Sequence, residues 1–600
     1  MAAPKGGCFG KILDIDLTSG KISTVTYDDE TARKYLGGAG LSTYYLYKEV
    51  PKGTDPLSPA NILMFASGPL CGTECPGARL TVCFKSPISG GLGNSYVGGQ
   101  FPSELKWAGW DMIKIRGKAP RLSYIYIKDD KVEIRDAAAM AGKDTFETEE
   151  MIKEEVKDPD AKCLVIGPAG ENVVPMACII SERFKAAGRL GGGAVMGSKN
   201  LKGVAVRGTG YVPLADKDAF HKIAGEAVEL CAMNDRVPGF RQFGTAQSLD
   251  QSGFVQTCLA TNNYQTGYLA DVDGIGSEEA ARTFWQKHSA CMGCQVHCMK
   301  IGVLRGTEKS DGVIAEGPEY ESGTMLGTNL GLSTLEDSMP LIELADALGL
   351  DNIGTGNAIA YAMELRQREL ITADDLDGID AQFGDAESAR ALMEAIANKK
   401  GKAGELLGKG TTAMAKHFGP EAAKFAVMSR GQGWAGWDAR TARGMGPTYA
   451  MGPRGGVHTD GASAKGIADR LVGSSCCLCY FVPATWRKRG NSLIWEMLNP
   501  ECGWDMDEAE FTLIGKRLVT LQRAYSRRET GLDRKGDVLA PRMKEEMPEG
   551  PGKGKKWTDE EEKKMQDDYY AYFGWDANGV PTEACLKEYG LEFCADCIKA

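Results

Sequence analysis

Hydrophobic residues change their spacing along the chain, from the alternation typical of strands in the first third to the 3.6-residue period of helices afterwards. Residues 10–20 and 21–27 alternate apolar and polar positions on both sides of a turn, which predicts a β-hairpin. A second hairpin is predicted where residues 122–128 and 132–134 flank a polar turn. Further elements expected in this part are buried strands at residues 61–66, 80–84 and 163–167 and a helix at residues 145–155.

From residue 213 onward the apolar positions recur at helical spacing. The helices expected between residues 213 and 428 cover residues 216–231, 277–288, 335–348, 386–399 and 410–417. A charged amphipathic helix is expected at residues 559–572, after a polar linker at residues 548–556. The pattern predicts an α+β fold, in which a β-rich domain at residues 1–212 precedes a mainly helical domain at residues 213–428 and a mainly helical C-terminal domain at residues 429–600.

Charge and hydropathy narrow the class of protein. A formal net charge of −11 argues against a nucleic-acid-binding protein, which usually carries a basic surface. No run of about eighteen apolar residues occurs, so no membrane span is expected. The first residues lack the apolar core of a signal peptide, and we therefore expect a cytoplasmic protein. In that compartment, eighteen cysteines indicate metal binding or reduced thiols rather than disulfides.

Three of these cysteines lie within eight residues, in the sequence Cys291-Met-Gly-Cys294-Gln-Val-His-Cys298. Three thiolates held this closely can bind zinc or a cubane iron–sulfur cluster, and either needs a fourth ligand. The next cysteines along the chain are Cys476, Cys477 and Cys479. Because a zinc finger normally completes its ligands within a few tens of residues, a 4Fe–4S cluster is favoured over zinc and over unligated thiols. The tail cysteines expected to remain free thiols are Cys585, Cys594 and Cys597.

Three glycine-rich stretches, at residues 37–40, 90–99 and 186–202, interrupt the β-rich part. The last stretch carries Arg189, Lys199 and Lys202 among exposed backbone amides. Cations beside free N–H groups suit an anion such as phosphate. None of the stretches has the residue order of a P-loop or of a dinucleotide-binding turn, so the anion site has to be of another kind.

Stretches at residues 55–61, 98–111, 187–202, 291–298, 316–321, 346–351 and 574–579 together match a family pattern. Through them the chain resembles the tungsten-containing aldehyde:ferredoxin oxidoreductases over nearly its whole length. The resemblance implies a β-rich base domain that carries one tungsten (or molybdenum) atom on two pyranopterins, with a Mg²⁺ ion bridging the pterin phosphates. It also implies a 4Fe–4S cluster beside one pterin and two mainly helical domains above the base.

The cysteine motif maps onto the family's cluster ligands. Cys291, Cys294 and Cys298 match the local triplet, and Cys479 matches the remote fourth ligand. The aligned Cys476 and Cys477 are alternatives to Cys479.

Two pterin motifs can be located through the resemblance. The first, D-x-x-G-L-D, is complete, and its residues are Asp346, Gly349, Leu350 and Asp351. The second, D-x-x-G-L-C, keeps Leu478 and Cys479. Ser474 stands at its aspartate position and Cys477 at its glycine position, which weakens the second motif.

The resemblance also assigns residues to the phosphates and to the metal. Arg79 matches an arginine that holds a pterin phosphate, and Tyr96 and Ala186 match positions whose carbonyl oxygens bind the Mg²⁺ ion. His458 matches a histidine beside the metal. A glutamate is expected there as well, and of the three candidates Glu316, Glu319 and Glu321 we favour Glu316.

The activity that the resemblance implies is the oxidation of an aldehyde with water to a carboxylic acid. Electrons would pass through the cluster to a ferredoxin or a small ferredoxin-like iron–sulfur subunit. A second hypothesis is the tungsten subunit of the ATP-independent benzoyl-coenzyme A reductases, which reduces an aromatic acyl-CoA on a similar scaffold. A third is an electron-transfer or scaffold protein that keeps only the cluster, but the intact first pterin motif, Arg79 and His458 argue against it. An oligomer is expected.

Overall fold

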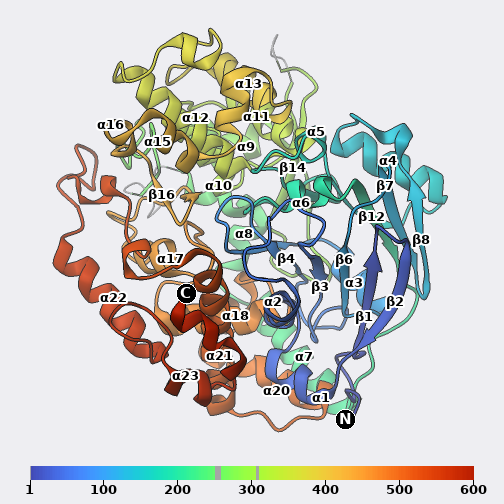
Figure 1. Cartoon of the computed structure of the whole chain (residues 1–600). Coiled ribbons are helices and arrows are strands. Elements are labelled where there is room, and N and C mark those ends of the chain that lie inside the picture. Colours follow the sequence, from blue (N-terminus) through green and yellow to red (C-terminus); the bar gives the residue numbers. More distant parts are fainter. Residues whose placement is uncertain (1, 251–257, 306–309) are drawn as a thin grey trace.

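The computed structural model describes residues 2–250, 258–305 and 310–600. Its N-terminal part contains two six-stranded sheets, ordered β2-β1-β6-β3-β4-β5 and β11-β10-β9-β12-β7-β8, which Figure 1 shows on one side of the molecule. The strands of the first sheet are β1 (Lys11–Asp16), β2 (Lys21–Thr26), β3 (Leu63–Ala66), β4 (Leu80–Lys85), β5 (Leu92–Val97) and β6 (Met112–Arg116). Those of the second are β7 (Ser123–Lys128), β8 (Lys131–Asp136), β9 (Lys162–Val165), β10 (Ile179–Ser181), β11 (Lys185–Ala187) and β12 (Leu201–Arg207).

One hydrophobic core joins the two sheets. Ile15 and Phe65 of the first sheet belong to the same buried cluster as Ile127 and Val204 of the second, together with residues of α3 (Phe101–Trp107) and α6 (Gly192–Ser198). The other face of the first sheet is covered by α2 (Gly38–Glu49) and C-terminal helices, and that of the second by α4 (Thr145–Val156). Because the first sheet is covered on both faces, β3 and β4 consist entirely of buried residues.

Both hairpins expected from the sequence are confirmed. β1 pairs with β2 and β7 with β8, each in antiparallel register. In the first turn the Asp16 carboxylate accepts the backbone N–H of Thr18 at 2.9 Å, and Gly20 has a φ of 70°. Glycine adopts this left-handed conformation without strain, so the local sequence specifies where the strand reverses.

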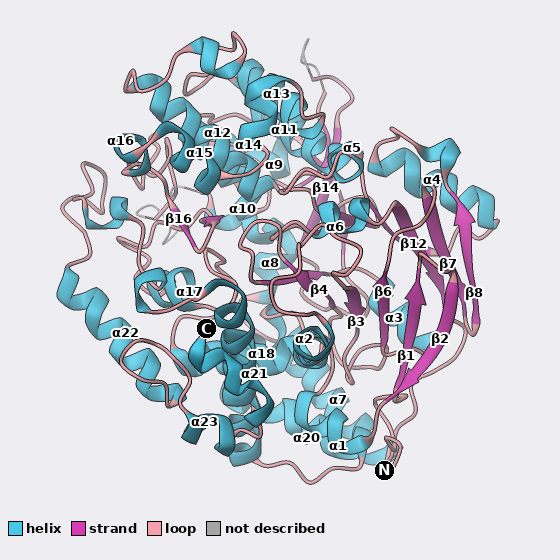
Figure 2. Cartoon of the chain, in the orientation of Figure 1, coloured by secondary structure: helices cyan, strands magenta, loops and turns pink. Residues whose placement is uncertain are grey.

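Helices dominate from residue 213 onward, and the predicted α+β fold is confirmed (Figure 2). A lobe at the top of Figure 1 packs around α11 and α12. The other helices of the N-terminal part are α1 (Asp29–Tyr35) and α5 (Pro168–Glu171). Those of residues 213–428 are α7 (Lys217–Ala232), α8 (Val237–Phe243), α9 (Ser277–Thr283), α10 (Tyr320–Met325), α11 (Leu335–Leu348), α12 (Asn352–Gln367), α13 (Ala386–Ala397), α14 (Gly401–Leu407), α15 (Thr411–Phe418) and α16 (Pro420–Ala423). Those of residues 429–600 are α17 (Met445–Met451), α18 (Ala464–Ser475), α19 (Phe481–Thr485), α20 (Ser492–Cys502), α21 (Glu508–Thr530), α22 (Asp559–Phe573) and α23 (Glu583–Glu588).

The prediction of a helix at residues 277–288 is correct only for its first half. α9 ends at Thr283, and the following residues form β13 (Trp285–Ser289), which pairs with β14 (Met299–Val303). β15 (Ile314–Glu316) completes this three-stranded sheet. The Trp285 indole N–H donates to the carbonyl oxygen of Gly317 at 2.6 Å, a contact between distant residues that overrides the local helical spacing. The cysteine triplet begins directly after β13, at Cys291.

Buried arginines on α21 hold the end of the chain against the core. The Arg527 guanidinium donates to the carbonyl oxygen of Cys597 at 2.9 Å, and that of Arg528 donates to the carbonyl oxygen of Tyr47 on α2 at 2.8 Å. Buried cations need such partners, so the tail is part of the fold. Its three cysteines are buried free thiols.

The predicted domain boundaries remain a prediction, because the packing does not follow them strictly. α7 lies after residue 212, yet its residues Phe220 and Ala224 belong to the core that contains the C-terminal helices. The short sheet of β16 (Met428–Ser429) and β17 (Gln432–Gly433) spans the second boundary. Within the described residues, none of the helices has the length and apolar character needed to cross a bilayer.

A carboxyl group is buried without partners at the base of the β-rich part. Glu501 on α20 is fully buried, and both of its carboxylate oxygens lack a hydrogen bond to the described residues. Burial raises the pKa of Glu501 from its ordinary value of 4.5 to about 8, against the lowering effect of the nearby Lys106 ammonium. In the folded chain this side chain is therefore protonated at neutral pH.

Replacing Glu501 by Gln should make the protein more stable in alkaline solution. Because the folded-state pKa is raised, the stabilisation from the protonated carboxyl is complete below about pH 4.5 and is lost as pH rises through about 8. Glu501→Gln removes this loss, which linkage limits to about 5 kcal/mol. We expect its advantage over the parent to grow between pH 5 and 9, measured by urea unfolding. The exposed Glu508→Gln is the matched control, and equal pH slopes for both variants would contradict the assignment.

Candidate active site

A cavity of ≈ 290 Å³ lies where the β-rich part meets the helical parts. Eleven residues singled out in the sequence line it together: Arg79, Tyr96, Ala186, Arg189, Glu316, Glu319, Glu321, Asp346, Leu350, Asp351 and His458. They come from positions spread over most of the chain, which is how concave ligand sites are usually built. Of the remaining pterin-motif residues, Gly349 directly precedes Leu350, and Leu478 lines a neighbouring cavity of ≈ 210 Å³.

Arg189 connects three parts of the chain at this cavity. Its Nε atom forms an ion pair with Oδ2 of Asp351 at 3.0 Å. Its guanidinium also donates to the carbonyl oxygens of Gly433 at 2.5 Å and Gly456 at 3.3 Å, and its backbone N–H donates to Ser95 Oγ at 3.3 Å. The side chain is almost completely buried. A planar guanidinium can serve several acceptors at once, which suits it to such a junction.

The first pterin motif forms a corner between two helices. Gly349, with a φ of 72°, ends α11, and the N–H of Leu350 donates back to the carbonyl oxygen of Ala345 at 2.8 Å. Leu350 is buried, and the Asp351 carboxylate then caps the N-terminus of α12. Asp346 lies on the last turn of α11, where it is buried and faces the cavity. The glycine and the second aspartate therefore have structural tasks besides any ligand contact.

Residues 474–479 form a second corner with the same hydrogen bonds. Leu478 N–H donates to Gly473 O at 2.9 Å, and Cys477 N–H donates to Ser474 O at 3.2 Å, as Leu350 and Gly349 do in the first corner. Cys477 has a φ of 62°, so it keeps the left-handed conformation that glycine has in the first corner. Cys479 therefore occupies the position that corresponds to Asp351.

The cysteines divide by burial. Of the eighteen free cysteines, fourteen are buried, and the four that are partly exposed are Cys291, Cys294, Cys298 and Cys479. Burial, with smaller contributions from the nearby Cys479 and Cys291, raises the pKa of the Cys294 thiol to about 12. Cys476 and Cys477 are buried, with the Cys477 thiol donating to the Ala66 carbonyl oxygen at 3.6 Å. The four partly exposed cysteines are thus the four that the family pattern assigns to a cluster.

Glycines allow the cysteine loop to lie against the β-rich base. The backbone N–H of Met292 donates to the carbonyl oxygen of Gly99 at 3.2 Å. A Cβ atom at Gly98 would lie only 2.7 Å from the Cys291 sulfur, so a larger residue there would push the loop away. The glycine-rich stretch at residues 90–99 has this packing role in addition to any anion contact.

Among residues 2–250, 258–305 and 310–600, the structure has no group of three or more His, Cys, Asp or Glu side chains arranged to hold one metal ion. A zinc ion needs its thiolates around one atom, whereas a cubane binds each thiolate to a different iron and spaces the sulfurs more widely.

Arg79 is the cation between the cavity and the thiols. Its backbone N–H donates to the carbonyl oxygen of Cys477 at 2.8 Å, and its guanidinium makes no hydrogen bond with any described residue. Burial acts to lower the pKa of Arg79, but the thiols of Cys479 and Cys291 raise it. This charged group is free to bind an anion in the cavity. Beside it, the guanidinium of Arg454 lies 4.6 Å from the ring of Tyr96.

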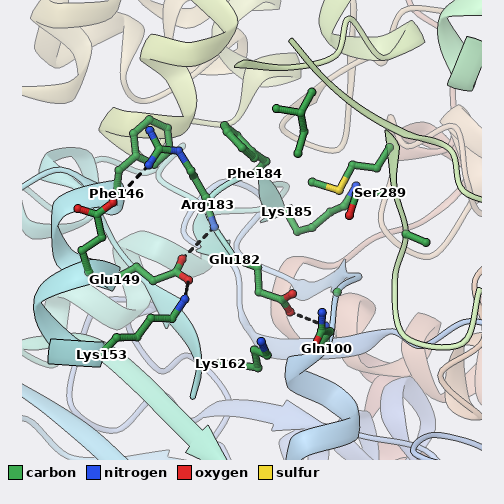
Figure 3. Close-up of a pocket in the computed structure, with 15 residues that line it drawn as sticks. Gln100, Phe146, Glu149, Lys153, Lys162, Glu182, Arg183, Phe184, Lys185 and Ser289 are labelled. Carbon is green, nitrogen blue, oxygen red and sulfur yellow. Dashed lines mark hydrogen bonds and ion pairs between the residues drawn. The ribbon is translucent and has the colours of Figure 1, made fainter. Parts of the chain in front are cut away.

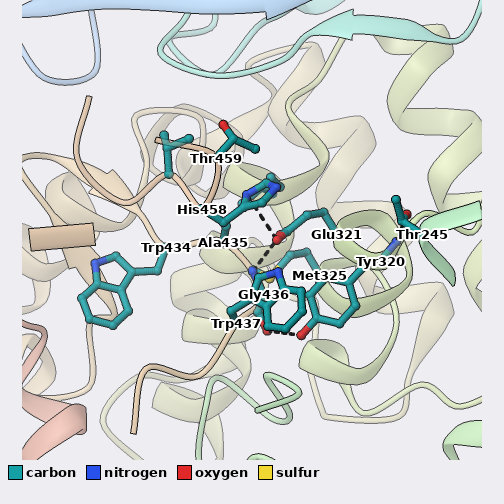
Figure 4. A network of polar contacts seen from close by, with 12 residues as sticks. Thr245, Tyr320, Glu321, Met325, Trp434, Ala435, Gly436, Trp437, His458 and Thr459 are labelled. Atoms are coloured by element: carbon teal, nitrogen blue, oxygen red, sulfur yellow. Dashed lines mark hydrogen bonds and ion pairs between the residues drawn. The ribbon is translucent and has the colours of Figure 1, made fainter. Parts of the chain in front are cut away.

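His458 and Glu321 meet in the cavity, as Figure 4 shows. His458 Nδ1 lies 3.2 Å from Glu321 Oε1, and Glu321 Oε2 accepts the backbone N–H of Gly436 at 2.7 Å. Burial lowers the pKa of His458 to about 3, aided by Arg189 and Arg454. Burial also raises the pKa of Glu321 to about 7. At neutral pH the imidazole is uncharged, and the carboxyl group can hold or release a proton.

Glu316, the glutamate favoured from the sequence, has a different partner. Its Oε1 atom lies 3.6 Å from Nζ of Lys185, at the start of β11. Burial raises the pKa of Glu316, while the Lys185 ammonium acts to lower it. Burial acts to lower the pKa of Lys185, but Glu316 and the thiols of Cys291 and Cys298 raise it. Glu316 still lines the cavity, so its role near a metal stays a prediction.

The sequence pattern missed two residues at this site and left a third undecided. Lys185 and Arg454 were not singled out, and Glu321 was only one of three candidates. Lys185 directly precedes Ala186, and Arg454 lies just before His458, so proximity to matched residues was the one signal available. Their partners are distant in sequence and become visible only in the folded chain.

Several buried polar atoms at the cavity lack a well-aligned hydrogen bond with described residues. They are Glu316 Oε1, Arg189 Nε, Glu321 Oε1 and His458 Nδ1. Their contacts with the described residues are the ion pairs of Arg189 with Asp351, Glu316 with Lys185 and Glu321 with His458, so these atoms keep capacity for a further polar partner. Donors, acceptors and cations converge here, which fits a cofactor that carries both phosphates and polar rings.

Comparisons with known proteins agree with this geometry. The tungsten-containing aldehyde ferredoxin oxidoreductase of Pyrococcus abyssi is 37% identical over 98% of this chain and 99% of its own. The aliphatic sulfonate oxidoreductase, WOR-like subunit, of Pyrococcus furiosus is 36% identical over 97% of both chains. Among solved structures, the active-site complex BamBC of benzoyl coenzyme A reductase with 1,5-dienoyl-CoA matches with a TM-score of 0.82 and 25% identity over 98% of both chains.

Two family models describe nearly the whole chain. The N-terminal domain of aldehyde ferredoxin oxidoreductase matches residues 12–208, and domains 2 and 3 of the same enzyme match residues 222–591. The first covers the two sheets, and the second covers the helical parts with the cysteine triplet and His458. The chain is therefore an oxidoreductase that belongs to the aldehyde ferredoxin oxidoreductase family.

Proposed function

We propose that this chain is a tungsten–pterin iron–sulfur enzyme that oxidises aldehydes to carboxylic acids. The reaction converts an aldehyde and one water into a carboxylic acid, two protons and two electrons, and the electrons leave for a ferredoxin or a ferredoxin-like subunit. Full-length identity of 37% to a tungsten-containing aldehyde ferredoxin oxidoreductase supports this choice. The observation that carries it is the contact between His458 and Glu321 in the same cavity as Arg79 and Arg189.

Different residues of the cavity would hold different parts of the cofactors. Arg79 and Arg189 would bind the pterin phosphates, with the carbonyl oxygens of Tyr96 and Ala186 on the bridging Mg²⁺ ion. Asp346 and Asp351 would accept hydrogen bonds from pterin N–H groups. Cys291, Cys294, Cys298 and Cys479 would hold the 4Fe–4S cluster. The metal would supply the two-electron acceptor, and the cluster would pass electrons on singly.

The His458–Glu321 pair would handle the protons. Because His458 is neutral at pH 7, it can donate one hydrogen bond to a developing oxyanion and accept another, without a change of charge. Glu321, with a pKa of about 7, can take a proton from water at neutral pH and return it to solvent. The Gly436 N–H fixes the orientation of the Glu321 carboxylate.

A second candidate is the reduction of an aromatic acyl-CoA, because the BamBC complex shares the fold with a TM-score of 0.82. Its identity to this chain is 25%, lower than that of the aldehyde oxidoreductases. The sulfonate oxidoreductase subunit is as similar as the aldehyde enzymes, so an alkyl sulfonate also belongs in any substrate screen. A protein that only carries a cluster would not require the pair of His458 and Glu321 inside the cavity, which argues against that hypothesis.

One experiment tests the proposed function. Tungsten and iron are measured in the purified protein, and aliphatic and aromatic aldehydes, aryl-CoA thioesters and alkyl sulfonates are then offered with a redox dye. We expect tungsten, iron and aldehyde-dependent dye reduction. If only the thioester or only the sulfonate is turned over, the proposed substrate class is wrong. If the protein contains no tungsten, the proposed cofactor is wrong.

The cluster assignment predicts that Cys479 is the fourth ligand. Cys479→Ala should lower iron from about four per chain and change the electron paramagnetic resonance signal of the reduced cluster. Cys476→Ala and Cys477→Ala are matched controls, because both thiols are buried away from the partly exposed ones. If either control loses iron while Cys479→Ala keeps it, the assignment is wrong.

The proposed role of His458 predicts a large loss of turnover without loss of cofactor. Removing a group that shares a hydrogen bond or a proton in the transition state costs about 10²–10⁴ in rate. His458→Ala should show a loss of that size with unchanged tungsten and iron contents, and His458→Asn should recover part of it if the role is donation. The exposed His417→Ala serves as control. Parent-like turnover in metal-replete His458→Ala would remove the imidazole from the mechanism.

The raised pKa of Glu321 predicts that the turnover rate depends on pH. Its pKa is raised to about 7, so below that pH it is protonated and cannot accept a proton. We expect kcat to rise as pH increases through about 7, and Glu321→Gln to remove both the inflection and most of the rate. Glu316→Gln should keep the inflection, since Glu316 pairs with Lys185. An inflection that disappears only with Glu316→Gln would return the role to the residue favoured from the sequence.

A further inference from the structure

Residues 434–437, with the sequence Trp-Ala-Gly-Trp, provide the backbone donor that contacts Glu321. The N–H of Gly436 donates to Glu321 Oε2 at 2.7 Å, and Oε1 of the same carboxyl group lies 3.2 Å from His458 Nδ1 (Figure 4). The segment lies outside every described helix and strand, so no regular ladder of hydrogen bonds holds this donor in place. Its position has to be set by contacts with other parts of the chain.

Three buried tyrosine hydroxyls bind the carbonyl oxygens of this segment. Those of Tyr264 and Tyr449 both donate to Ala435 O, at 2.7 Å and 2.9 Å. The hydroxyl of Tyr320 donates to Gly436 O at 3.1 Å. The three tyrosines are at most 3% exposed. Because a buried hydroxyl needs an acceptor for its one proton, these contacts are kept as long as the core stays packed.

The Ala435 carbonyl and the Gly436 N–H belong to one planar peptide group. In a trans peptide the C=O and N–H bonds point in opposite directions, and this peptide is trans. The hydroxyls that hold the Ala435 oxygen therefore also aim the Gly436 N–H at Glu321. Tyr264 and Tyr449 act on the donor through one rigid unit.

Tyr320 fixes the other side of the donor. It is the first residue of α10 and directly precedes Glu321, so one helix supplies both the carboxyl group and a hydroxyl that positions its donor. The backbone N–H of Ala260 donates to the same Gly436 oxygen at 3.0 Å. A Cβ atom at Gly436 would lie only 2.6 Å from Thr324 Cγ2 on α10, so the segment is packed directly against this helix.

A second buried glutamate shows what such backbone donors do. In a cavity of ≈ 360 Å³ beside α4, Glu182 accepts the backbone N–H groups of Gln100 and Phe101 (Figure 3). Burial raises the pKa of Glu182, and both N–H groups act to lower it. These two donors lie at the start of α3, which holds them in place. The Gly436 donor has no helix of its own and depends on the tyrosines instead.

The charges around Glu321 do not involve the three hydroxyls. Burial raises the pKa of Glu321, the Gly436 N–H and Arg189 act to lower it, and Asp351 acts to raise it. Burial also raises the pKa values of the three tyrosines well above 10, so their hydroxyls are neutral. A change from Tyr to Phe therefore removes no charge. The titratable and charged groups that face Glu321 are Arg189, Asp351, His458, Tyr264, Tyr320, Tyr449 and Tyr480.

We propose that Tyr264, Tyr320 and Tyr449 are positioning residues of the active site, whose hydroxyls keep the Gly436 N–H on Glu321 and so set how tightly Glu321 holds its proton. In this role they act only through the backbone of residues 435 and 436. Their importance for turnover rests on the proposed function, in which Glu321 takes a proton from water. Their effect on Glu321 itself does not.

Loss of these hydroxyls should make Glu321 a weaker acid. Without them the segment can relax, and the hydrogen bond from Gly436 to Glu321 lengthens. This bond favours the ionised carboxylate, so weakening it should raise the pKa of Glu321 further above its ordinary value than the present value of about 7.

The test follows the proton of Glu321 directly. The C=O stretch of the protonated carboxyl group is titrated by infrared difference spectroscopy on the holoenzyme, and its band is assigned as the one that Glu321→Gln lacks. Tyr320→Phe and the double variant Tyr264→Phe/Tyr449→Phe should each move the midpoint upward by about 0.5–1 pH unit, which is roughly threefold to tenfold tighter proton binding. The inflection of kcat should move with it.

Tyr361→Phe is the matched control. Tyr361 is fully buried, and its hydroxyl has no hydrogen bond with the described residues, so its removal should leave the midpoint unchanged. A purely structural role would lower the unfolding temperature of the Tyr264, Tyr320 and Tyr449 variants without moving the midpoint, and that result would overturn the inference. An equal shift in Tyr361→Phe would overturn it as well.

The inference and the proposed function can fail separately. A shifted infrared midpoint in a chain that oxidises no aldehyde would reject the proposed function and keep the positioning role. Aldehyde oxidation by variants whose infrared midpoint equals that of the parent would reject the positioning role and keep the proposed function.

Discussion

The ion pair between Arg189 and Asp351 is the contact on which the arrangement of the cavity depends. Arg189 comes from the β-rich base, Asp351 from the corner between α11 and α12, and the carbonyl oxygens of Gly433 and Gly456 come from the C-terminal part. Both charges are buried, so removal of either partner would leave the other uncompensated, at a cost of roughly 3–5 kcal/mol. The cavity therefore forms only when all three parts of the chain are docked. A site of this kind is rigid because the same interactions hold the fold and the residues that line the site.

The two helix corners share one backbone conformation and one set of hydrogen bonds. In both, a left-handed residue ends a helix, a buried leucine follows, and the next residue lines a cavity. The first corner places Asp351 there, and the second places Cys479. Cys477 adopts at a cost of about 1 kcal/mol the conformation that Gly349 adopts freely. The second corner therefore keeps its hydrogen bonds although its aspartate and glycine have been replaced, which explains why Cys479 stays partly exposed while Cys476 and Cys477 are buried.

The elements that could be predicted from the sequence are those whose conformation is set by neighbouring residues. The hairpin at residues 11–26 follows from alternation and a glycine turn, and the first pterin corner follows from six residues with a glycine at the helix end. The strand at residues 285–289 could not be predicted, because its helical spacing is overridden by pairing with β14 and by the bond from Trp285 to Gly317. The glutamate beside His458 could not be chosen either. Glu316 and Glu321 are five residues apart, and only the path of the chain through β15 and α10 decides which one meets the imidazole.

Desolvation determines the chemistry of the cavity. Burial raises the pKa values of Glu316, Glu321, Asp346 and Asp351 and lowers that of His458, so it acts on these carboxyl groups and on this imidazole in favour of their uncharged forms. The nearby guanidinium groups act on His458 in the same direction as burial. An imidazole of low pKa beside a carboxyl group with a pKa near 7 does not form a salt bridge at neutral pH. The pair instead holds at most one mobile proton, which can move between carboxyl group, imidazole and water without leaving an unpaired charge in a low-dielectric space.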